Sequence, residues 1–476
     1  MNQRYLVSFD TDRIKEYVFA TEKLREIRGA SRLLDDLNSA KIMKQVIDSL
    51  GGDYQSIFWG GGSGAVLAPS KEAADFLIAA VEKLYREKTV TASISGAAVP
   101  FPSGTETKDF GKRMEAAGFR LRHIKDEKAA CILPGGESFT QPCASCQRYP
   151  AITATNDDER IVLCDSCAKK REKEKKRKHE EKESRLFDDL ESLGQLSRPS
   201  GYIGFIQVDG NNMGDLLTRL SDQRAYTTLA DGLRELIKES TPALPLECHE
   251  VLLAGGDDLI LVTTAELALN AAMGIAQYIE KESPDLLKEV GLSSSKCTVA
   301  GSVVLAHATF PIAAFRSLAD QLQKNAKRKC AEGGYETSAI DFIVVTSAGS
   351  SDVATLRNEV LTEQSFVFPH GNRKIRLTRR PYTLNEMSDL IKHAQTFKNI
   401  PQSQLQFLYE GLFHSQAEAI YRWGKVAGRK ENREAMDDFY KTFGEVVGGL
   451  PPWKSGEKEI DYTTALGDLI EIYRFV

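Results

Sequence analysis

The chain has 476 residues, which is too long for one ordinary hydrophobic core and suggests about three domains. Its composition, 42% hydrophobic and 27% charged, is that of a globular protein and excludes a disordered or fibrous one. The net charge of −5 argues against wholesale coating of nucleic acid but permits a local basic surface.

The cysteine content and the apolar segments indicate the compartment. Eight cysteines in a chain of this length are too few for a disulfide scaffold, which favours a reducing, cytoplasmic setting. A charge interrupts the N-terminal apolar segment early, and no apolar stretch approaches the ~20 residues of a membrane span. We therefore expect no secretory signal and no membrane association.

The first hundred residues predict a βαββαβ order. An apolar strand over residues 5–10 precedes a helical pattern over 14–38. Residues 56–68 place a glycine-rich turn between two apolar runs, as in a hairpin. A helix over 71–88 and a strand over 90–99 complete a ferredoxin-like unit.

The same order returns later in the chain, which indicates an internal duplication and two related domains. The second copy consists of a strand at residues 202–208, a helix near 223–238, a hairpin at 251–262, a helix at 265–281 and a strand at 298–306. Further on, residues 384–447 show mostly helical spacing of apolar residues.

These patterns divide the chain into four segments in an α+β fold. We expect a degenerate ferredoxin-like unit over residues 1–102 and a helical linker with a zinc ribbon over 103–197. A second ferredoxin-like unit should span 198–346, and a helical domain 347–476, beginning with a linker at 347–352.

The second hairpin carries Gly255, Gly256, Asp257 and Asp258 at its turn, and Asp209 ends the neighbouring strand. Carboxylates on rigid elements are what two Mg²⁺ (or Mn²⁺) ions ~4 Å apart require for nucleotidyl transfer. The two glycines would let a triphosphate approach the backbone. The alternative is a plain hairpin turn with Asp209 as a helix cap, but the matching strand ends favour a catalytic metal site.

Three further segments are candidate nucleotide contacts. Gly210, Asn211 and Asn212 follow Asp209 and could offer backbone N–H groups to phosphates. In the first copy, the turn with Gly61, Gly62, Ser63 and Gly64 lacks the acidic pair, and it is either a second nucleotide site or only a permissive turn. Lys327 could neutralise a triphosphate, or simply complement the C-terminus of its helix.

Four cysteines predict a structural zinc site. Cys143, Cys146, Cys164 and Cys167 form two Cys-x-x-Cys pairs, the spacing of a four-thiolate ribbon with no position left for a catalytic water. The alternative is a redox dithiol. The adjoining run of residues 168–182 mixes Lys, Arg and Glu, which suggests a solvated helix joining the domains rather than a nucleic-acid contact.

The two ferredoxin-like units, the four-cysteine insert and the acidic second hairpin resemble the large palm-domain subunit of type III CRISPR effector complexes. The segments at residues 10–21 and 24–31 are also similar to that family's opening palm segment. Many members begin with an HD nuclease domain, whereas this chain starts directly in the first palm, so we expect no DNA cleavage by it.

The resemblance implies an activity and its partners. It implies synthesis of cyclic oligoadenylate second messengers from ATP, with two ATP molecules between the palms and Asp257 and Asp258 aligned with metal. Ser63 and its glycines would line the acceptor pocket, and other effector subunits with guide and target RNA would be the partners.

Two other functions remain open from the sequence. One is a catalytically silent or partner-dependent scaffold subunit, although a scaffold has no need to hold three carboxylates together against their repulsion. The other is a templated polymerase, for which the sequence shows no cleft of clustered cations and stacking aromatics. Base selectivity, ring size, trigger and oligomeric state do not follow from the sequence.

Overall fold

The structure is a computed structural model of the 476-residue chain. It describes residues 3–102, 108–128, 140–155, 160–180, 187–220, 222–241, 248–292, 296–346, 352–367, 371–444, 451–455 and 461–476.

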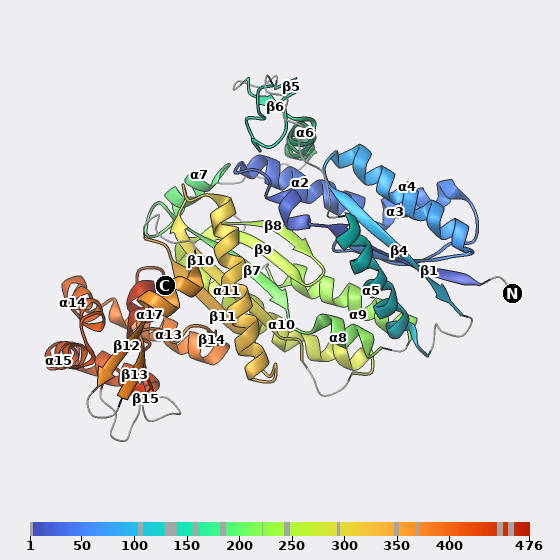
Figure 1. Ribbon diagram of the computed structural model, residues 1–476. Helices are drawn as coiled ribbons and strands as arrows, with labels where there is room; N and C mark the ends of the chain where they lie inside the picture. Colours follow the sequence, from blue (N-terminus) through green and yellow to red (C-terminus); the bar gives the residue numbers. More distant parts are fainter. Residues whose placement is uncertain are drawn as a thin grey trace.

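The first palm is a four-stranded antiparallel sheet with helices on one face (Figure 1). Its strands have the order β2-β3-β1-β4, which is the ferredoxin-like order. Side chains alternate along β1, where Leu6 and Val7 enter two different cores. The elements are β1 (Arg4–Asp12), α1 (Ile14–Val18), α2 (Leu24–Leu37), α3 (Ala40–Leu50), β2 (Gln55–Gly60), β3 (Ser63–Ala68), α4 (Lys71–Thr89) and β4 (Ser93–Phe101).

The second palm repeats this order and extends it. Strands β10-β7-β9-β8 are arranged as in the first palm, and β11 and β14 continue the sheet beyond β10. The elements are β7 (Tyr202–Gly210), α8 (Met213–Thr218), α9 (Gln223–Glu239), β8 (His249–Gly255), β9 (Asp258–Thr264), α10 (Ala265–Glu289), β10 (Val299–His307), α11 (Ile312–Glu332), β11 (Ala339–Val344) and β14 (Tyr382–Thr383). The duplication and the fold class predicted from the sequence are confirmed.

The two palms pack against each other through reciprocal contacts. Helix α2 of the first palm contacts strand β8 of the second, and helix α9 of the second contacts β2 of the first. In one contact the buried side chains of Arg28 and Glu250 form an ion pair at 3.0 Å. In the other, Arg234 donates a hydrogen bond of 2.8 Å to the carbonyl oxygen of Trp59. Both large hydrophobic cores contain residues of both palms, so the two sheets form one packed body.

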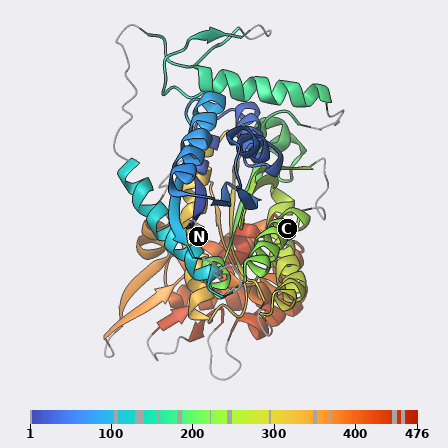
Figure 2. The same cartoon turned by 90° about the vertical axis from the view of Figure 1, so that its right-hand side faces the viewer.

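The two-stranded ribbon of the insert between the palms projects at one end of the molecule (Figures 1 and 2), whereas the first helix of the insert packs on β1 and β4 of the first palm. It consists of α5 (Phe110–Lys128), the two-stranded ribbon β5 (Thr153–Ala154) and β6 (Val162–Leu163), α6 (Asp165–Glu180) and α7 (Leu190–Leu196). The prediction that residues 168–182 form a solvated helix is wrong for its first half. There α6 packs on α2, and Lys170 and Glu174 are buried, because Gly29 gives the two helices room to approach closely.

The C-terminal domain is mainly helical but contains a small sheet that the sequence pattern did not predict. Its strands pair in the order β12-β13-β16-β15, of which β15 and β16, with two and three residues, are too short for a periodic signal. The elements are α12 (Val353–Thr355), the π-helix η3 (Leu356–Val360), β12 (Thr362–Val367), β13 (Gly371–Arg376), α13 (Leu384–Phe397), α14 (Gln402–Leu412), α15 (Gln416–Ala427), α16 (Arg433–Phe443), β15 (Lys454–Ser455), β16 (Asp461–Thr463) and α17 (Leu466–Ile472).

The linker before the C-terminal domain and the possible membrane spans were also predicted from the sequence. The linker expected at residues 347–352 lies outside the described residues except for Asp352, which caps α12. Within the described part of the chain, no helix combines the length and apolarity that a membrane span requires.

Candidate active site between the palms

The three predicted metal carboxylates lie at the ends of adjacent strands. Asp209, near the end of β7, is directly opposite Asp258, the first residue of β9, in the antiparallel register. Asp257 occupies the tight turn that joins β8 to β9, and its carbonyl oxygen accepts a hydrogen bond of 3.2 Å from the N–H of Gly210. The turn also contains Gly256, whose φ of +62° suits glycine. The sheet therefore holds the three carboxyl groups together at one end of its central strands.

The glycine turn of the first palm faces this acidic turn. Gly61 has a φ of +61°, and a Cβ atom there would lie 2.1 Å from the backbone nitrogen of Gly256. Only a residue without a side chain permits this approach of two backbones. The two hairpins of the duplicated fold thus meet turn to turn.

A cavity of about 260 Å³ lies beside this contact and opens onto both palms. Asp257 and Asp258 line it from the second palm. From the first palm come Gly61, Gly62 and Ser63, together with six further residues, Asp10, Ile14, Lys15, Leu34, Asp35 and Asn38. The wall therefore combines acidic groups, one lysine and the backbone of a glycine turn.

Two lysines neutralise the carboxylates in this structure. The ammonium group of Lys15, from helix α1 of the first palm, is 3.2 Å from a carboxylate oxygen of Asp258. Lys327, from helix α11, forms an ion pair with Asp209. Burial alone would lower the pKa of Lys327, but hydrogen bonding to Asp209 and the surrounding carboxylates outweigh it, so the pKa lies above its ordinary value.

The acidic pair has perturbed ionisation. Burial raises the pKa of Asp257 to about 6, and the charges of Asp209 and Asp258 add to the effect. Burial also raises the pKa of Asp258, against the opposing effect of Lys15. Carboxyl groups that are costly to ionise side by side are typical of a site that receives a cation.

The carboxylates do not converge on one point here. Among the described residues, only the four cysteines bring three or more ligand atoms within 4.8 Å of one another. Asp209 and Asp258 are instead paired with lysines from two different helices. Oxygen ligands of this kind fit Mg²⁺, which would take the place of the lysines.

The first palm has an acidic strand end of its own, but a lysine occupies it. Lys125 of α5 is 2.5 Å from Asp10 and 3.3 Å from Asp12, and it also donates to the carbonyl oxygen of Thr11. Burial raises the pKa of Asp10, although Lys125 opposes the rise. The first palm therefore presents a glycine turn to the cavity and keeps its acids neutralised.

Some predicted nucleotide contacts need correction. The N–H groups of Gly210 and Asn211 already donate to the carbonyl oxygens of Asp257 and Thr298, so they are not free for phosphates. Asn211 is buried, and its amide also bonds Thr298, whereas Asn212 is exposed at the start of α8. Gly64 lies beneath the ring of Trp59, which would be 2.1 Å from a Cβ atom, so it serves packing.

The sequence reasoning missed Lys15, Asp35 and Lys125 as members of these acidic sites. Lys15 follows the strand-end acids of β1 by a few residues, a signal that was present in the sequence. Asp35 and Lys125 lie on helices that only the packing brings to the strand ends, and no sequence pattern indicates them.

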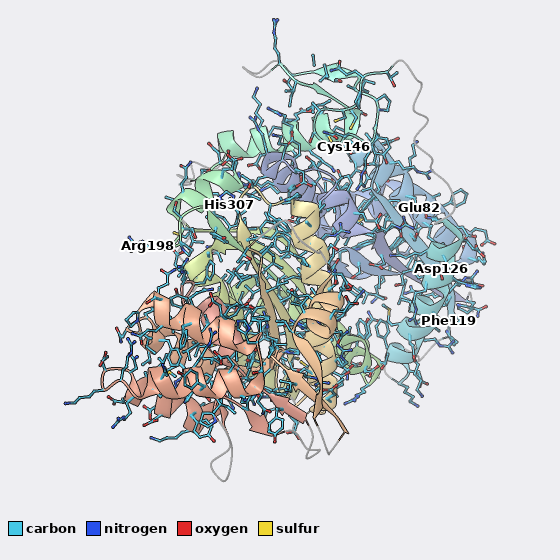
Figure 3. The ribbon with its side chains drawn as sticks, turned by 60° about the vertical axis from the view of Figure 1, so that its left-hand side comes forward. Glu82, Phe119, Asp126, Cys146, Arg198 and His307 are labelled. Atoms are coloured by element: carbon cyan, nitrogen blue, oxygen red, sulfur yellow. The ribbon has the colours of Figure 1, made fainter. Side chains whose placement is uncertain are left out.

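The four cysteines form a compact cluster in the ribbon, where Figure 3 labels Cys146. Cys143, Cys164 and Cys167 are buried. Close by, the ammonium group of the buried Lys170 donates a hydrogen bond of 2.6 Å to the carbonyl oxygen of Tyr17 and lies 3.9 Å from the centre of its ring. Burial lowers the pKa of Lys170 while the cysteines oppose the decrease. A buried cation that feels the charge of three of these cysteines fits a zinc ion held by thiolates.

Known proteins resemble the chain in sequence over the second palm and in fold throughout. Residues 202–333 match the family model described as Cas10/Cmr2, second palm domain. No curated protein sequence matches the chain. Among solved structures, Csm1 of T. onnurineus matches with 12% identity and a TM-score of 0.59. The Csm1–Csm4 cassette matches in complex with cA4, at 12% identity and a TM-score of 0.57, and with one ATP, at 11% and 0.58.

Each of these three comparisons covers 100% of this chain and 70% of the other. At such identities the structures establish the shared fold, and the family model identifies the domain that holds the acidic hairpin. The chain therefore matches the Cas10/Cmr2 second palm domain over residues 202–333 and shares the fold of Csm1, which is found in the type III-A CRISPR-Csm interference complex.

Proposed function

We propose that the protein is a Mg²⁺-dependent nucleotidyl cyclase that converts ATP into cyclic oligoadenylates for antiviral, CRISPR-type signalling. The observation that carries the proposal is the pair Asp257 and Asp258, which faces a cavity between two palms and ionises against the charge of Asp209. No structural role in the fold requires three carboxyl groups at one sheet edge.

In the proposed reaction, the 3′-hydroxyl of one ATP forms a bond to the α-phosphorus of another, and the bond to pyrophosphate breaks. Asp209, Asp257 and Asp258 would hold Mg²⁺, which would activate the hydroxyl and neutralise the leaving group. Lys15 and Lys327, released from the carboxylates, would pair with phosphate oxygens. Gly61, Gly62 and Ser63 would form the wall for the acceptor nucleotide.

The relatives support this proposal. The Csm1–Csm4 cassette is known in complexes with one ATP and with cA4, a cyclic oligoadenylate, and its fold covers this whole chain. The chain has the same palm pair, with an acidic turn in the second palm and a glycine turn in the first. By the same comparison, a Csm4-type subunit is the proposed partner within a guide-RNA complex that recognises target RNA.

A partner-dependent or silent scaffold subunit is the second candidate. It is favoured by one observation, the ion pairs of Lys15 with Asp258 and of Lys327 with Asp209, which occupy the proposed metal ligands. If the protein is a partner-dependent enzyme, a bound partner would have to move Lys15 of α1 or Lys327 of α11 away from these carboxylates before metal and ATP could enter.

The test is incubation of the purified chain with each labelled NTP and Mg²⁺ or Mn²⁺, followed by mass spectrometry. An Asp257→Ala/Asp258→Ala variant is compared with Asp437→Ala/Asp438→Ala, which removes an adjacent acidic pair from the surface of α16. We expect cyclic products from the parent and the surface variant and none from the active-site variant.

If the chain alone is silent, the assay is repeated with candidate effector subunits and target RNA. No cyclic product from any NTP under either condition would overturn the cyclase proposal and leave the scaffold.

We also propose a zinc ion at Cys143, Cys146, Cys164 and Cys167. Metal analysis of the purified chain should find one zinc per molecule, and Cys146→Ser should lose it while Cys248→Ser, outside the cluster, retains it. Full zinc content in Cys146→Ser would contradict the assignment.

A further inference from the structure

A second cavity, of about 660 Å³, lies where the second palm meets the C-terminal domain. The end of helix α11 forms one side, and residues around η3, β13 and the segment before β14 form the other. In Figure 1 this junction is on the side of the second palm that faces away from the first palm. The cavity is therefore separate from the one that Asp257 and Asp258 line.

The charge of the lining is strongly positive. Six basic side chains line the cavity and Glu332 is its one acidic lining residue in the described chain; the six are Arg328, Lys329, Arg357, Arg376, Arg379 and Arg380. Such a concentration of arginine contrasts with the net charge of −5 of the whole chain.

Two of the arginines are fixed by buried acids below the cavity floor. Arg357 makes hydrogen bonds of 2.6 and 2.5 Å to both carboxylate oxygens of the fully buried Asp341. Arg380 is held at 3.0 Å by Asp468, also fully buried, and at 2.9 Å by Glu471. The side chains of Arg357 and Arg380 are only 13% and 2% exposed, so these pairs fix the two arginines as part of the cavity wall rather than as ligand contacts.

Other cations are left for a ligand. Arg328 donates only to Asn325 among the interactions of the described residues, and Arg376 has no side-chain partner among them. Lys329 and Arg379 share one carboxylate, Glu386, at 3.9 and 4.0 Å, which is the limit of an ion pair, and Arg379 also donates a hydrogen bond of 3.1 Å to the carbonyl oxygen of Phe443. The cavity thus combines fixed arginines with cations whose charge is weakly compensated.

We propose that this cavity binds a polyphosphate anion, such as a chain of two or three linked phosphoryl groups. Guanidinium forks match phosphate oxygens in pairs, and several cations around one cavity favour a ligand with several charges over a single carboxylate. No aromatic side chain lines the cavity in the described chain, so the phosphates rather than a stacked base supply the recognition. This inference does not depend on the proposed cyclase reaction.

The test is titration of the full chain with inorganic tripolyphosphate by calorimetry in a buffer with chelator. Without metal, the carboxylates between the palms repel the probe, so they are kept intact in every variant. Arg328→Ala/Arg376→Ala is compared with Arg429→Ala/Lys430→Ala, which removes two exposed cations elsewhere on the C-terminal domain.

We expect the first pair of substitutions to weaken tripolyphosphate binding at least about tenfold and the control pair to change it less than about twofold. Both removed side chains are exposed, and an unchanged unfolding temperature checks the fold. Equal affinities of the two variants, or no binding to the parent chain, would overturn the proposal. Orthophosphate in a parallel titration should bind more weakly than tripolyphosphate, and equal binding would contradict a site for linked phosphates.

Discussion

At the scale of single residues, Asp257 links ionisation to stability. Its pKa of about 6 exceeds the ordinary 3.8, so the metal-free folded state binds a proton more tightly than the unfolded chain does. The stability that the protonated Asp257 contributes to the folded state is therefore fully present below about pH 4, and it is lost as the pH rises through about 6 and the carboxyl group ionises.

We therefore predict that Asp257→Asn stabilises the metal-free protein at pH 8, by on the order of 1 kcal/mol, and that this gain disappears near pH 4. Denaturant unfolding in chelator at several pH values measures it, with Asp437→Asn on the surface as the control. A variant no more stable than the parent at pH 8 would contradict the assignment. Added Mg²⁺ should stabilise the parent more than the variant.

Lys15 is the residue that connects the first palm to Asp258, a proposed metal ligand of the second. It competes with a cation for Asp258, so removing its charge should tighten Mg²⁺ binding about threefold while reducing metal-free stability by roughly 0.5–1 kcal/mol. Lys15→Met tests this in a Mg²⁺ titration followed by thermal unfolding. Lys71→Met, which loses a comparable ion pair with Asp75 on the surface of α4, should leave the Mg²⁺ response unchanged. Unchanged or weaker Mg²⁺ binding by Lys15→Met would argue against the competition.

At the scale of elements, the meeting of the two hairpins depends on Gly61. A methyl group there would collide with backbone atoms of Gly255 and Gly256, which cannot move aside as a flexible side chain can. Gly334 provides a matched control, since its φ of +64° is nearly that of Gly61 but nothing lies within 4 Å of the added atom.

Gly334→Ala should cost about 1–2 kcal/mol for the left-handed backbone alone. Gly61→Ala should cost a further ~1–3 kcal/mol for the collision and should also abolish nucleotide conversion, because the cavity wall shifts. Denaturant unfolding of both variants gives the difference. Equal costs would show that the turns do not need this contact.

The sequence predicted the individual helices, strands and motifs better than the contacts that they make with one another in the fold. The strand-end acids, the acidic turn and the cysteine spacing are local patterns, so they could be found without a structure. The neutralising roles of Lys15 and Lys125 depend on helix packing across long sequence separations, which no local pattern encodes. For the same reason, α6 looked solvated although Lys170, Arg171 and Glu174 are buried where it packs on α2.

At the scale of the whole molecule, helix α11 connects the first palm, the second palm and the C-terminal domain. Near its start, Arg316 donates to the carbonyl oxygen of Lys15 in the first palm. Farther along, Lys327 pairs with Asp209, and at its end Arg328 and Lys329 line the basic cavity beside the C-terminal domain. A displacement of this helix would therefore act on the palm contact, on the proposed metal ligand Asp209 and on the basic cavity together.

The buried pair of Arg28 and Glu250 is the strongest test of whether the palms act as one body. It ties α2 of the first palm to β8, the strand that leads into the acidic turn. Removing either partner leaves the other as a buried charge that has lost this ion pair, so Arg28→Met and Glu250→Leu should each lower the free energy of unfolding by about 3 kcal/mol. The double variant should lose less than the sum by about 1–3 kcal/mol.

The exposed pair of Lys71 and Asp75 should show a coupling below about 0.5 kcal/mol in the same double-mutant cycle. Each single variant at the buried pair should also reduce nucleotide conversion, because the acidic turn moves relative to Lys15 and Gly61. The double variant should recover conversion together with stability if docking of the palms sets the activity. Recovery of stability without conversion would instead show that the charges of Arg28 and Glu250 themselves position the turn.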